Sequence, residues 1–429
     1  MPLAPGSKKG EPVPSHRLPR VLACAALGLA LVACVPVAAT AKSGSNDGRL
    51  TRTAFYAPGP TPGAKEQIVD LLRQGQIRDA FLIAAMSVQP TAVWITQGTP
   101  AEARAEVRGI VRRAKSRGSI PVLVAYNIPG RDCAGLSAGG ATTTAAYKAW
   151  IDGFAKGLGN ARAVVILEPD GLGLLPSNCG GPNPGYPFTD TQRYEELNYA
   201  VDRLGDQPGT DVYLDGTHSR WLSVGDISLR LVTAGVQRAR GFFVNVSNFQ
   251  PTEHLVKYGT WISKCIHWGT VIRPPWAFDG DRFRWEWCAS QYFPANVDDF
   301  ATWGLTDTWY DEQVGNPDPA LLTKFVVDTS RNGQGRWIPP VGKYTGDPLD
   351  WCNPPGRGLG QRATTTTGSP LADAFLWVKV PGESDGTCAR GGAPPGSVDP
   401  EWGVVDPAAG QWFPQQALEL ARLANPPLF

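Results

Sequence analysis

The sequence predicts an α/β protein built as a parallel barrel, and three observations point to that class. Short apolar runs of strand length alternate with helix-like segments along most of the chain. Runs such as AVVIL at residues 163–167 contain no polar residue, as expected of parallel strands that are covered on both faces. No G-x-G-x-x-G motif follows an early strand, so the alternative, a doubly wound open sheet, is less favoured.

The expected elements follow one another as apolar runs separated by amphipathic segments. Seven strands are predicted, at residues 92–95, 122–128, 163–168, 212–215, 241–246, 324–328 and 374–380. Helix-like segments lie between them at residues 100–117, 142–158, 191–204 and 223–235. Residues 261–319 interrupt the alternation, because they are rich in aromatic residues and lack a clear period. We interpret them as a loop insertion within one domain at residues 52–429.

The N-terminus has the pattern of an export signal. Basic residues precede an apolar run at residues 21–33, which is too short to span a membrane. The small residues at 39–41 offer a cleavage site, so residues 1–41 are predicted to be a signal peptide and residues 42–51 a flexible segment. We expect a secreted protein. The run LVAC ending at Cys34 resembles a lipoprotein box, so lipid anchoring at the cell surface through Cys34 is the alternative.

Removal of a signal peptide leaves six cysteines, a number that implies disulfides in an exported protein. They are Cys133, Cys179, Cys265, Cys288, Cys352 and Cys388. Six cysteines allow 15 connectivities; pairing of sequence neighbours is a hypothesis that would brace the loops after the acid-bearing strands. No C-x-x-C motif or Cys/His cluster occurs, so we expect no metal and no other cofactor.

Composition narrows the possible partners. The 40 basic and 39 acidic residues give a formal charge of +1, which favours neither nucleic acid nor an anionic membrane as a partner. The chain has 15 Trp and 11 Tyr. Such rings fill cores, and they also stack on the faces of sugars. No protein partner is implied, and we expect a monomer.

Acidic residues are predicted to gather at one end of the barrel. The carboxyl ends of parallel strands meet there, and catalytic groups of barrels lie at that face. The acids placed at this end are Asp132, Glu168, Asp170, Asp215, Glu383 and Asp385. Crowded carboxylates repel, so at least one should keep its proton near neutral pH. A neutral acid beside an ionised one is the pair that glycoside hydrolysis requires; the simpler interpretation is helix caps and ion pairs with Arg131 and Lys379.

Seven ordered motifs resemble those of glycoside hydrolase family 6, the inverting cellulases. They are YNIPGRDC (126–133), EPD (168–170), DGTHSRW (215–221), NVSN (245–248), DTSRNG (328–333), WCNP (351–354) and KVPGESDG (379–386). The resemblance covers the chain from about residue 53 to its end, apart from the insertion. It implies a distorted, incompletely closed α/β barrel and a β-1,4-glucan as substrate.

The resemblance also implies catalytic roles for four residues. Asp170 is similar to the general acid that protonates the leaving glycosidic oxygen, and Asp132 to the neighbour that helps keep that acid protonated. Tyr126 matches the tyrosine that presses on the distorted sugar. Asp385 lies where a base has been proposed, although a relay through water is the rival view. The substrate-binding or site-supporting residues so implied are Trp94, Asp215, His218, Trp221, Asn248, Trp351, Lys379 and Glu383.

The chain departs from the family pattern at one position. The family usually has a serine six residues after the aspartate of the Arg-Asp-Cys motif, where it helps to hold the nucleophilic water. Here that position is Ala138, and Ser137 precedes it. Either Ser137 or a backbone carbonyl takes this role, or the relay is altered.

Three functional alternatives follow. The compact segment 132–147 resembles that of open, endo-acting members, so an endoglucanase is expected ahead of a cellobiohydrolase of the same family. A non-catalytic glycan-binding protein would explain the aromatic residues but not the acids. The segment GLSAG at residues 135–139 fits the G-x-S-x-G motif of serine hydrolases. The preceding strand ends several residues too early for the required elbow, and no His follows His267.

Overall fold

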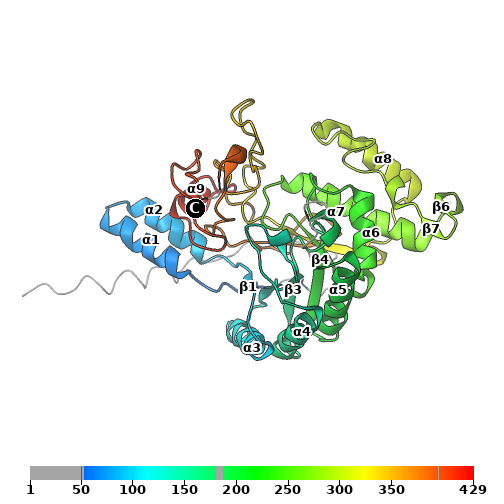
Figure 1. Ribbon diagram of the computed structural model, residues 1–429, viewed down its shortest axis with the longest axis horizontal. Coiled ribbons are helices and arrows are strands. Elements are labelled where there is room, and N and C mark those ends of the chain that lie inside the picture. The colour runs from blue at the N-terminus through cyan, green and yellow to red at the C-terminus, as the bar shows by residue number, and fades with distance from the viewer. Residues whose placement is uncertain (1–49, 51–52, 180–186, 395) are drawn as a thin grey trace, which may run out of the picture. The chain divides into compact units, whose positions relative to one another are not determined.

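Seven parallel strands form one curved sheet in the order β1-β2-β3-β4-β5-β8-β9 (Figure 1). The strands are β1 (Val93–Ile95), β2 (Val122–Ala125), β3 (Ala163–Leu167), β4 (Thr210–Asp215), β5 (Gly241–Val244), β8 (Lys324–Asp328) and β9 (Ala372–Leu376). Each strand pairs with the next strand of the sheet along the chain, so their carboxyl ends lie at a common edge.

The two outer strands approach each other without forming a ladder within the described residues. The Ala92 N–H donates to the carbonyl of Trp377 at 2.8 Å, and the indole N–H of Trp94 donates to the carbonyl of Val378 at 2.9 Å. We call this junction the seam. The protein is therefore a distorted, incompletely closed α/β barrel of seven strands, which confirms the predicted fold class.

The structure, a computed structural model, describes residue 50 and residues 53–179, 187–394 and 396–429. All of them belong to one unit, residues 43–429. The predicted signal peptide, which includes Cys34, lies outside the described ranges. The predicted flexible segment at residues 42–51 also lies outside them, apart from Leu50. No helix in the described ranges combines the length and the apolar character that crossing a bilayer requires.

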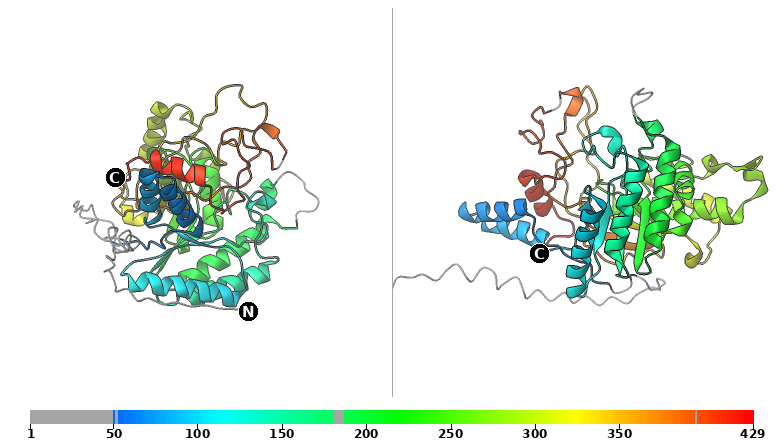
Figure 2. Two further views of the ribbon diagram at one scale, coloured as in Figure 1. Left: turned by 90° about the vertical axis from the view of Figure 1, so that its left-hand side faces the viewer. Right: turned by 60° about the horizontal axis from the view of Figure 1, so that its bottom comes forward.

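Helices pack along the outer face of the sheet, as Figure 2 shows. They are α3 (Pro100–Ser116), α4 (Thr144–Leu158), α5 (Asp190–Gly205), α6 (Val224–Thr233) and α7 (Thr252–His267). Four of them begin at a Thr or Ser whose hydroxyl accepts an N–H three residues later, namely Thr99, Thr143, Thr189 and Ser223. These caps explain why the helices start within two residues of the predicted positions.

Strand residues alternate between two apolar layers. Leu123 and Val165 pack in the layer beneath the helices, whereas Val124 and Ile166 pack inside the barrel. This period of two follows from strand geometry, in which successive side chains point to opposite faces. Both faces are buried, which is why the strands have continuous apolar sequences.

Several predicted strands are longer than the observed ones, and the two that extend furthest, at residues 122–128 and 374–380, end early for a common physical reason. Residues 126–128 leave the sheet because the carboxylate of Glu168 accepts the N–H groups of Asn127 and Ile128. Likewise, Asp328 accepts the N–H groups of Val378 and Lys379 after β9. At both strand ends, a buried carboxylate accepts the N–H groups that the carbonyls of a neighbouring strand would otherwise accept.

The aromatic segment 261–319 belongs largely to the core. It comprises the end of α7, a hairpin of β6 (Phe278–Asp279) and β7 (Arg282–Phe283), and α8 (Gly304–Gln313). Trp261, Trp268 and Trp303 are fully buried and pack on other rings, for example Trp261 on Trp303 with centroids 5.1 Å apart, whereas Trp276 and Trp287 are exposed. The buried rings therefore stabilise the fold rather than face a ligand.

The first and last helices of the described chain pack together (Figure 1). They are α1 (Pro62–Arg73), α2 (Ile77–Ser87) and α9 (Pro414–Arg422). Leu82 and Ile83 of α2 join Leu420 of α9 in one apolar cluster.

Three disulfides link sequence neighbours, so that hypothesis is confirmed. They join Cys133 to Cys179, Cys265 to Cys288, and Cys352 to Cys388. The first ties the loop after β2 to the loop after β3. The third ties the loop after β8 to the loop after β9, so both brace the carboxyl edge of the sheet.

Candidate active site

A cleft of about 820 Å³ lies at the carboxyl edge of the sheet. Predicted site residues from all seven strands, or from the loops that follow them, line it. They are Trp94, Tyr126, Asp132, Asp170, His218, Trp221, Asn248, Trp351, Lys379, Glu383 and Asp385. Asp215 and Glu168, which the sequence also places at this edge, do not line the cleft. The loop before α9 adds a further wall, formed by residues 408–410.

Asp170 projects into the cleft from a tight turn after β3. Glu168 and Asp170 both have positive φ, 50° and 64°, so the chain reverses immediately after the strand. No described N–H or hydroxyl donates to the Asp170 carboxyl. Burial raises the pKa of Asp170 well above its usual value, and the negative charges of Asp215, Asp132 and Asp385 raise it further. Asp170 is therefore suited to keep its proton and to act as an acid.

Asp132 lies in the loop after β2, on the same cleft. One of its carboxylate oxygens accepts the N–H of Ser137 at 2.6 Å. Burial raises the pKa of Asp132, while this hydrogen bond and the charge of Arg131 oppose the rise. Ser137 and Ala138 both line the cleft beside it.

Asp385 has the opposite environment. Burial raises its pKa, but the charges of Arg331 and Lys379 outweigh burial and hold the pKa below its usual value. Arg331 donates to both carboxylate oxygens at 2.9 Å, and Lys379 Nζ lies 3.4 Å from Oδ1. The N–H of Asn353 donates to Oδ2 at 3.0 Å. The site thus brings together one carboxyl whose surroundings favour the ionised form and another, Asp170, whose surroundings favour the neutral form.

Asp215 supports the cleft from behind. It is buried at the end of β4, where its carboxylate accepts the N–H groups of Leu172 and Gly173 at 3.1 and 3.0 Å and that of Thr217 at 2.9 Å. These hydrogen bonds from Leu172 and Gly173 hold the backbone that follows Asp170 in place. Three amide donors occupy its oxygens, which explains why it does not face the cleft.

Glu168 lies at the same strand end but is fully buried and not part of the cleft lining. Its carboxylate binds the backbone of the loop after β2, as described above. Burial raises its pKa to about 7. Glu168 thus joins the two loops that carry Asp132 and Asp170.

Aromatic rings form the walls of the cleft. Trp94 and Tyr126 pack edge to face, with ring centroids 5.4 Å apart, and Arg131 covers the Tyr126 ring at 4.5 Å. Trp221 packs over Gly173, where a Cβ atom would lie 2.4 Å from the indole. Trp351 is 42% exposed. Such flat, partly exposed rings can stack on sugar rings.

The remaining polar groups of the cleft differ in charge. Burial and the charge of Arg220 lower the pKa of His218 to about 3, so its imidazole is neutral near pH 7. Burial raises the pKa of Glu383, while Lys379 opposes the rise. Lys379 also donates to the carbonyl of Ser384 at 3.0 Å. Asn248 lines the cleft next to Ser247.

Two important residues were given no role from the sequence. Arg331 is fully buried and pairs with Asp385, and Asn353 is fully buried and bonds to the same carboxylate. Arg331 lies in the motif DTSRNG, and Asn353 lies in the motif WCNP. A basic residue three positions after an apolar strand was the available signal for Arg331, because a buried Arg needs an acidic partner.

One grouping of metal-ligand atoms occurs among the described residues. The sulfur of Cys388 and the carboxylates of Asp399 and Asp406 lie within 4.8 Å of one another. The sulfur belongs to the disulfide with Cys352, so it is not a thiolate ligand. This group lies behind the cleft.

A parallel α/β barrel whose carboxyl edge holds neutral and ionised carboxyls between indole rings defines a carbohydrate-active acid–base hydrolase. The family model "Glycosyl hydrolases family 6" matches residues 50–424. The chain belongs to this family.

Similar proteins agree with the family. Endoglucanase A of Cellulomonas fimi is 33% identical over 348 residues, which are 81% of this chain and 57% of that protein. This chain therefore spans little more than half of that relative. Endoglucanase 1 of Streptomyces halstedii is 33% identical over 404 residues, 93% of this chain and 96% of that protein. A structure of the endoglucanase Cel6 from Mycobacterium tuberculosis, in complex with a thio-linked methyl cellobiosyl-cellobioside, has a TM-score of 0.63 at 33% identity, covering 88% and 99% of the two chains.

Proposed function

We propose that this protein hydrolyses β-1,4-glucosidic bonds of cellulose or soluble β-glucans, internally within the chain and with inversion at the anomeric carbon. The observation that carries the proposal is that Asp170, whose pKa is raised, and Asp385, whose pKa is lowered by Arg331 and Lys379, line one aromatic cleft. Relatives named endoglucanases, at 33% identity, support the same substrate class.

In the proposed mechanism, Asp170 gives its proton to the leaving glycosidic oxygen. A water molecule attacks the anomeric carbon from the opposite face, which requires room between the acid and the groups that receive the water's proton. Because Arg331 donates a hydrogen bond to each carboxylate oxygen of Asp385, Asp385 is a weak proton acceptor. We therefore assign Asp385 the role of a negative charge that stabilises the positive transition state, with the water's proton leaving through other water in the cleft.

The other cleft residues are proposed to bind the glucan. Trp94, Trp221 and Trp351 would stack on sugar rings, and Tyr126 would press on the ring at the cleavage site. Lys379, Glu383, His218 and Asn248 offer hydrogen bonds to hydroxyl groups. Asp132 is proposed to help to keep the proton on Asp170, because its charge raises the pKa of that residue.

We also propose that the protein is exported, with residues 1–41 as signal peptide. Three disulfides in the described chain support export, because such bonds persist in oxidising compartments. Lipid attachment at Cys34 remains the alternative form of export, and mass spectrometry of the mature N-terminus separates the two.

Proton NMR of the products from a soluble glucan tests the reaction. We expect new α-anomeric ends to appear before mutarotation, which requires cleavage of a β-linkage with inversion. New β-ends would contradict inversion, and no new reducing ends would favour a non-catalytic glycan-binding protein.

Viscometry of carboxymethylcellulose tests the endo mode. Internal cuts lower viscosity after few bonds are broken, so we expect a rapid fall relative to the reducing ends released. A slow fall with cellobiose as the main product would instead favour a cellobiohydrolase of the same family.

A further inference from the structure

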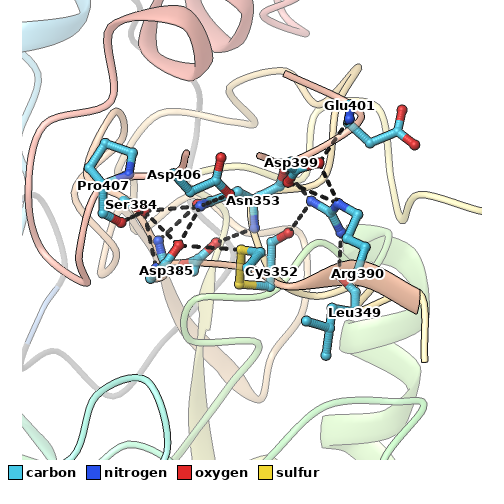
Figure 3. Close-up of a disulfide and its surroundings, with 12 residues drawn as sticks. Leu349, Cys352, Asn353, Ser384, Asp385, Arg390, Asp399, Glu401, Asp406 and Pro407 are labelled. Atoms are coloured by element: carbon cyan, nitrogen blue, oxygen red, sulfur yellow. Dashed lines mark hydrogen bonds and ion pairs between the residues drawn. A yellow bond between two sulfur atoms is a disulfide. The ribbon is translucent and has the colours of Figure 1, made fainter. Parts of the chain in front are cut away.

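Asn353 is the centre of a buried hydrogen-bond network behind the cleft (Figure 3). It is fully buried and has a φ of 41°, a conformation that Asn tolerates better than most residues. It bonds reciprocally with Asp385: its N–H donates to Oδ2 at 3.0 Å, and its Oδ1 accepts the N–H of Asp385 at 2.8 Å. Asn353 thus holds both the backbone and the carboxylate of Asp385.

The side-chain amide of Asn353 extends this hold to neighbouring residues. Its Nδ2 lies 2.9 Å from Ser384 Oγ, 3.0 Å from the carbonyl of Gly386 and 2.8 Å from Oδ2 of Asp406. Its carbonyl accepts bonds from Arg390 at 2.9 Å and from the Trp402 indole at 2.7 Å. No polar atom of Asn353 is left without a partner.

Asp406 and Asp399 form a buried carboxyl pair next to this centre, and they are 2% and 0% exposed. Asp399 holds Arg390, whose Nε donates to both its oxygens at 3.0 Å. Oδ1 of Asp406 receives no hydrogen bond from any described residue. A carboxylate oxygen of Asp406 lies within 4.8 Å of one of Asp399, so the two buried carboxyls repel each other when both are ionised.

We propose that Asn353 is the positioning residue for Asp385 and that its hold depends on Asp406 remaining protonated. The groups that face Asp406 are Asp399, Arg390, the Asn353 amide and the Cys388 disulfide sulfur. Arg390 is the one cation among them, and Asp399 already binds it. A charge on Asp406 would therefore be buried and uncompensated.

Ionisation of Asp406 would reach the cleft by two routes. One route is the bond from Asn353 to Asp406, because a displaced Asp406 pulls on the residue that holds Asp385. The other is the chain itself. Ser384 Oγ donates to the carbonyl of Pro407 at 2.7 Å, and residues 408–410 form a cleft wall. Burial raises the pKa of Asp406 to about 7, with the charge of Asp399 adding to the rise, so this change falls near neutral pH.

The test for Asp406 rests on the proposed function and uses Asp406→Asn. An amide at this position can accept from Asn353 and donate to Asp399, but it cannot ionise. The control is Asp281→Asn, the same change at an exposed residue of the turn between β6 and β7. The substrate is dinitrophenyl β-cellobioside, whose leaving group needs no acid, so loss of the Asp170 proton does not limit its rate.

For the wild type and Asp281→Asn, kcat on this substrate should fall as the pH rises through about 7. For Asp406→Asn the fall should move upward by at least one pH unit, with the acid limb unchanged. Superimposed profiles for all three proteins would overturn the role of Asp406.

Thermal unfolding provides a readout that does not depend on activity. The raised pKa means that folded Asp406 keeps a proton that the unfolded chain loses above about pH 4. The Tm of Asp406→Asn should therefore equal that of the wild type near pH 4 and exceed it increasingly up to about pH 7. A difference that does not change with pH would overturn the proposal, whereas an inactive wild type would count only against the proposed function.

Asn353→Asp tests the positioning of Asp385. It keeps the shape of the side chain but removes the amide donors and adds a charge. We expect kcat to fall at least tenfold with KM within twofold of the wild type, because Asn353 does not line the cleft. Wild-type kcat in this variant would overturn the positioning role; if the variant does not fold, the two Asp406→Asn measurements still decide the proposal.

Discussion

Arg331 and Asp385 form a buried ion pair in which both carboxylate oxygens accept a guanidinium N–H at 2.9 Å. Their side chains are 0% and 5% exposed, so water cannot replace either partner. Asp385 therefore remains charged when other acids of the cleft take up protons. That negative charge contributes to the raised pKa of the neighbouring Asp170.

Replacement of Arg331 by Gln should destabilise the protein. It leaves Asp385 buried with only Lys379 as a cation, and loss of one partner of a buried pair costs about 3–5 kcal/mol. The paired Asp385 has a lowered pKa, so its stabilising effect is present above about pH 4 and is lost as the pH falls through the folded-state pKa. Urea unfolding should show a large loss at pH 7 and a smaller one near pH 3. Equal losses at both pH values would contradict this ion pair as the cause.

The loss of activity caused by Asp170→Asn should depend on the leaving group of the substrate. General acid catalysis contributes about 10²–10⁴-fold, so we expect a loss of that order on soluble glucan. On dinitrophenyl β-cellobioside the loss should be less than about tenfold, because the leaving group needs no proton. Steady-state rates on the two substrates provide the measurement. Equal losses on both would remove Asp170 as the acid.

Asp132→Asn should move the alkaline limb of the pH–rate profile on soluble glucan to lower pH. The charge of Asp132 raises the pKa of Asp170, so its removal lets Asp170 lose its proton earlier. Asn can still accept the N–H of Ser137, which preserves the loop. The pH dependence of kcat/KM reports the effect, and a limb at the wild-type position would argue against this electrostatic role.

Removal of the Cys133–Cys179 disulfide by a double Ser substitution should lower stability. The bond closes a loop with a sequence separation of 46, and the chain-entropy relation gives about 4 kcal/mol for a loop of that size. Because the loop contains Asp170 and Asp132 directly precedes Cys133, activity should fall at temperatures at which the fold persists. Calorimetry of the variant and the wild type would measure the first effect. An unchanged Tm would show that the bond does not constrain the unfolded chain.

Much of the fold could be predicted because its signals are local. Apolar runs gave the seven strands, and Thr and Ser caps gave the helix starts. The ends of β2 and β9 could not be placed, because the carboxylates of Glu168 and Asp328 take up the following N–H groups from distant parts of the chain. Incomplete closure was implied by the family resemblance alone, since alternation of strands and helices is the same in open and closed barrels.

The cleft was predictable as a set of strand-end residues, but their division of labour was not. Asp215 and Glu168 occupy strand ends like Asp170, yet both turn away to bind backbone N–H groups. Nothing in their spacing distinguishes them from a cleft acid. The network of Asn353, Asp399 and Asp406 joins loops more than 30 residues apart in sequence, and side-chain contacts of that kind leave no periodic pattern.

The seam of the barrel limits how substrate preference can be redesigned. Trp94 is a proposed sugar platform, and its indole N–H also fastens the first strand edge to the last. A smaller ring there would loosen the closure of the whole sheet along with the grip on one glucose unit. Trp351 does not join two strands in this way, because its indole N–H has no hydrogen-bond partner among the described residues. Substrate specificity can therefore be changed at Trp351 without affecting the rigidity of the sheet, whereas a change at Trp94 affects both.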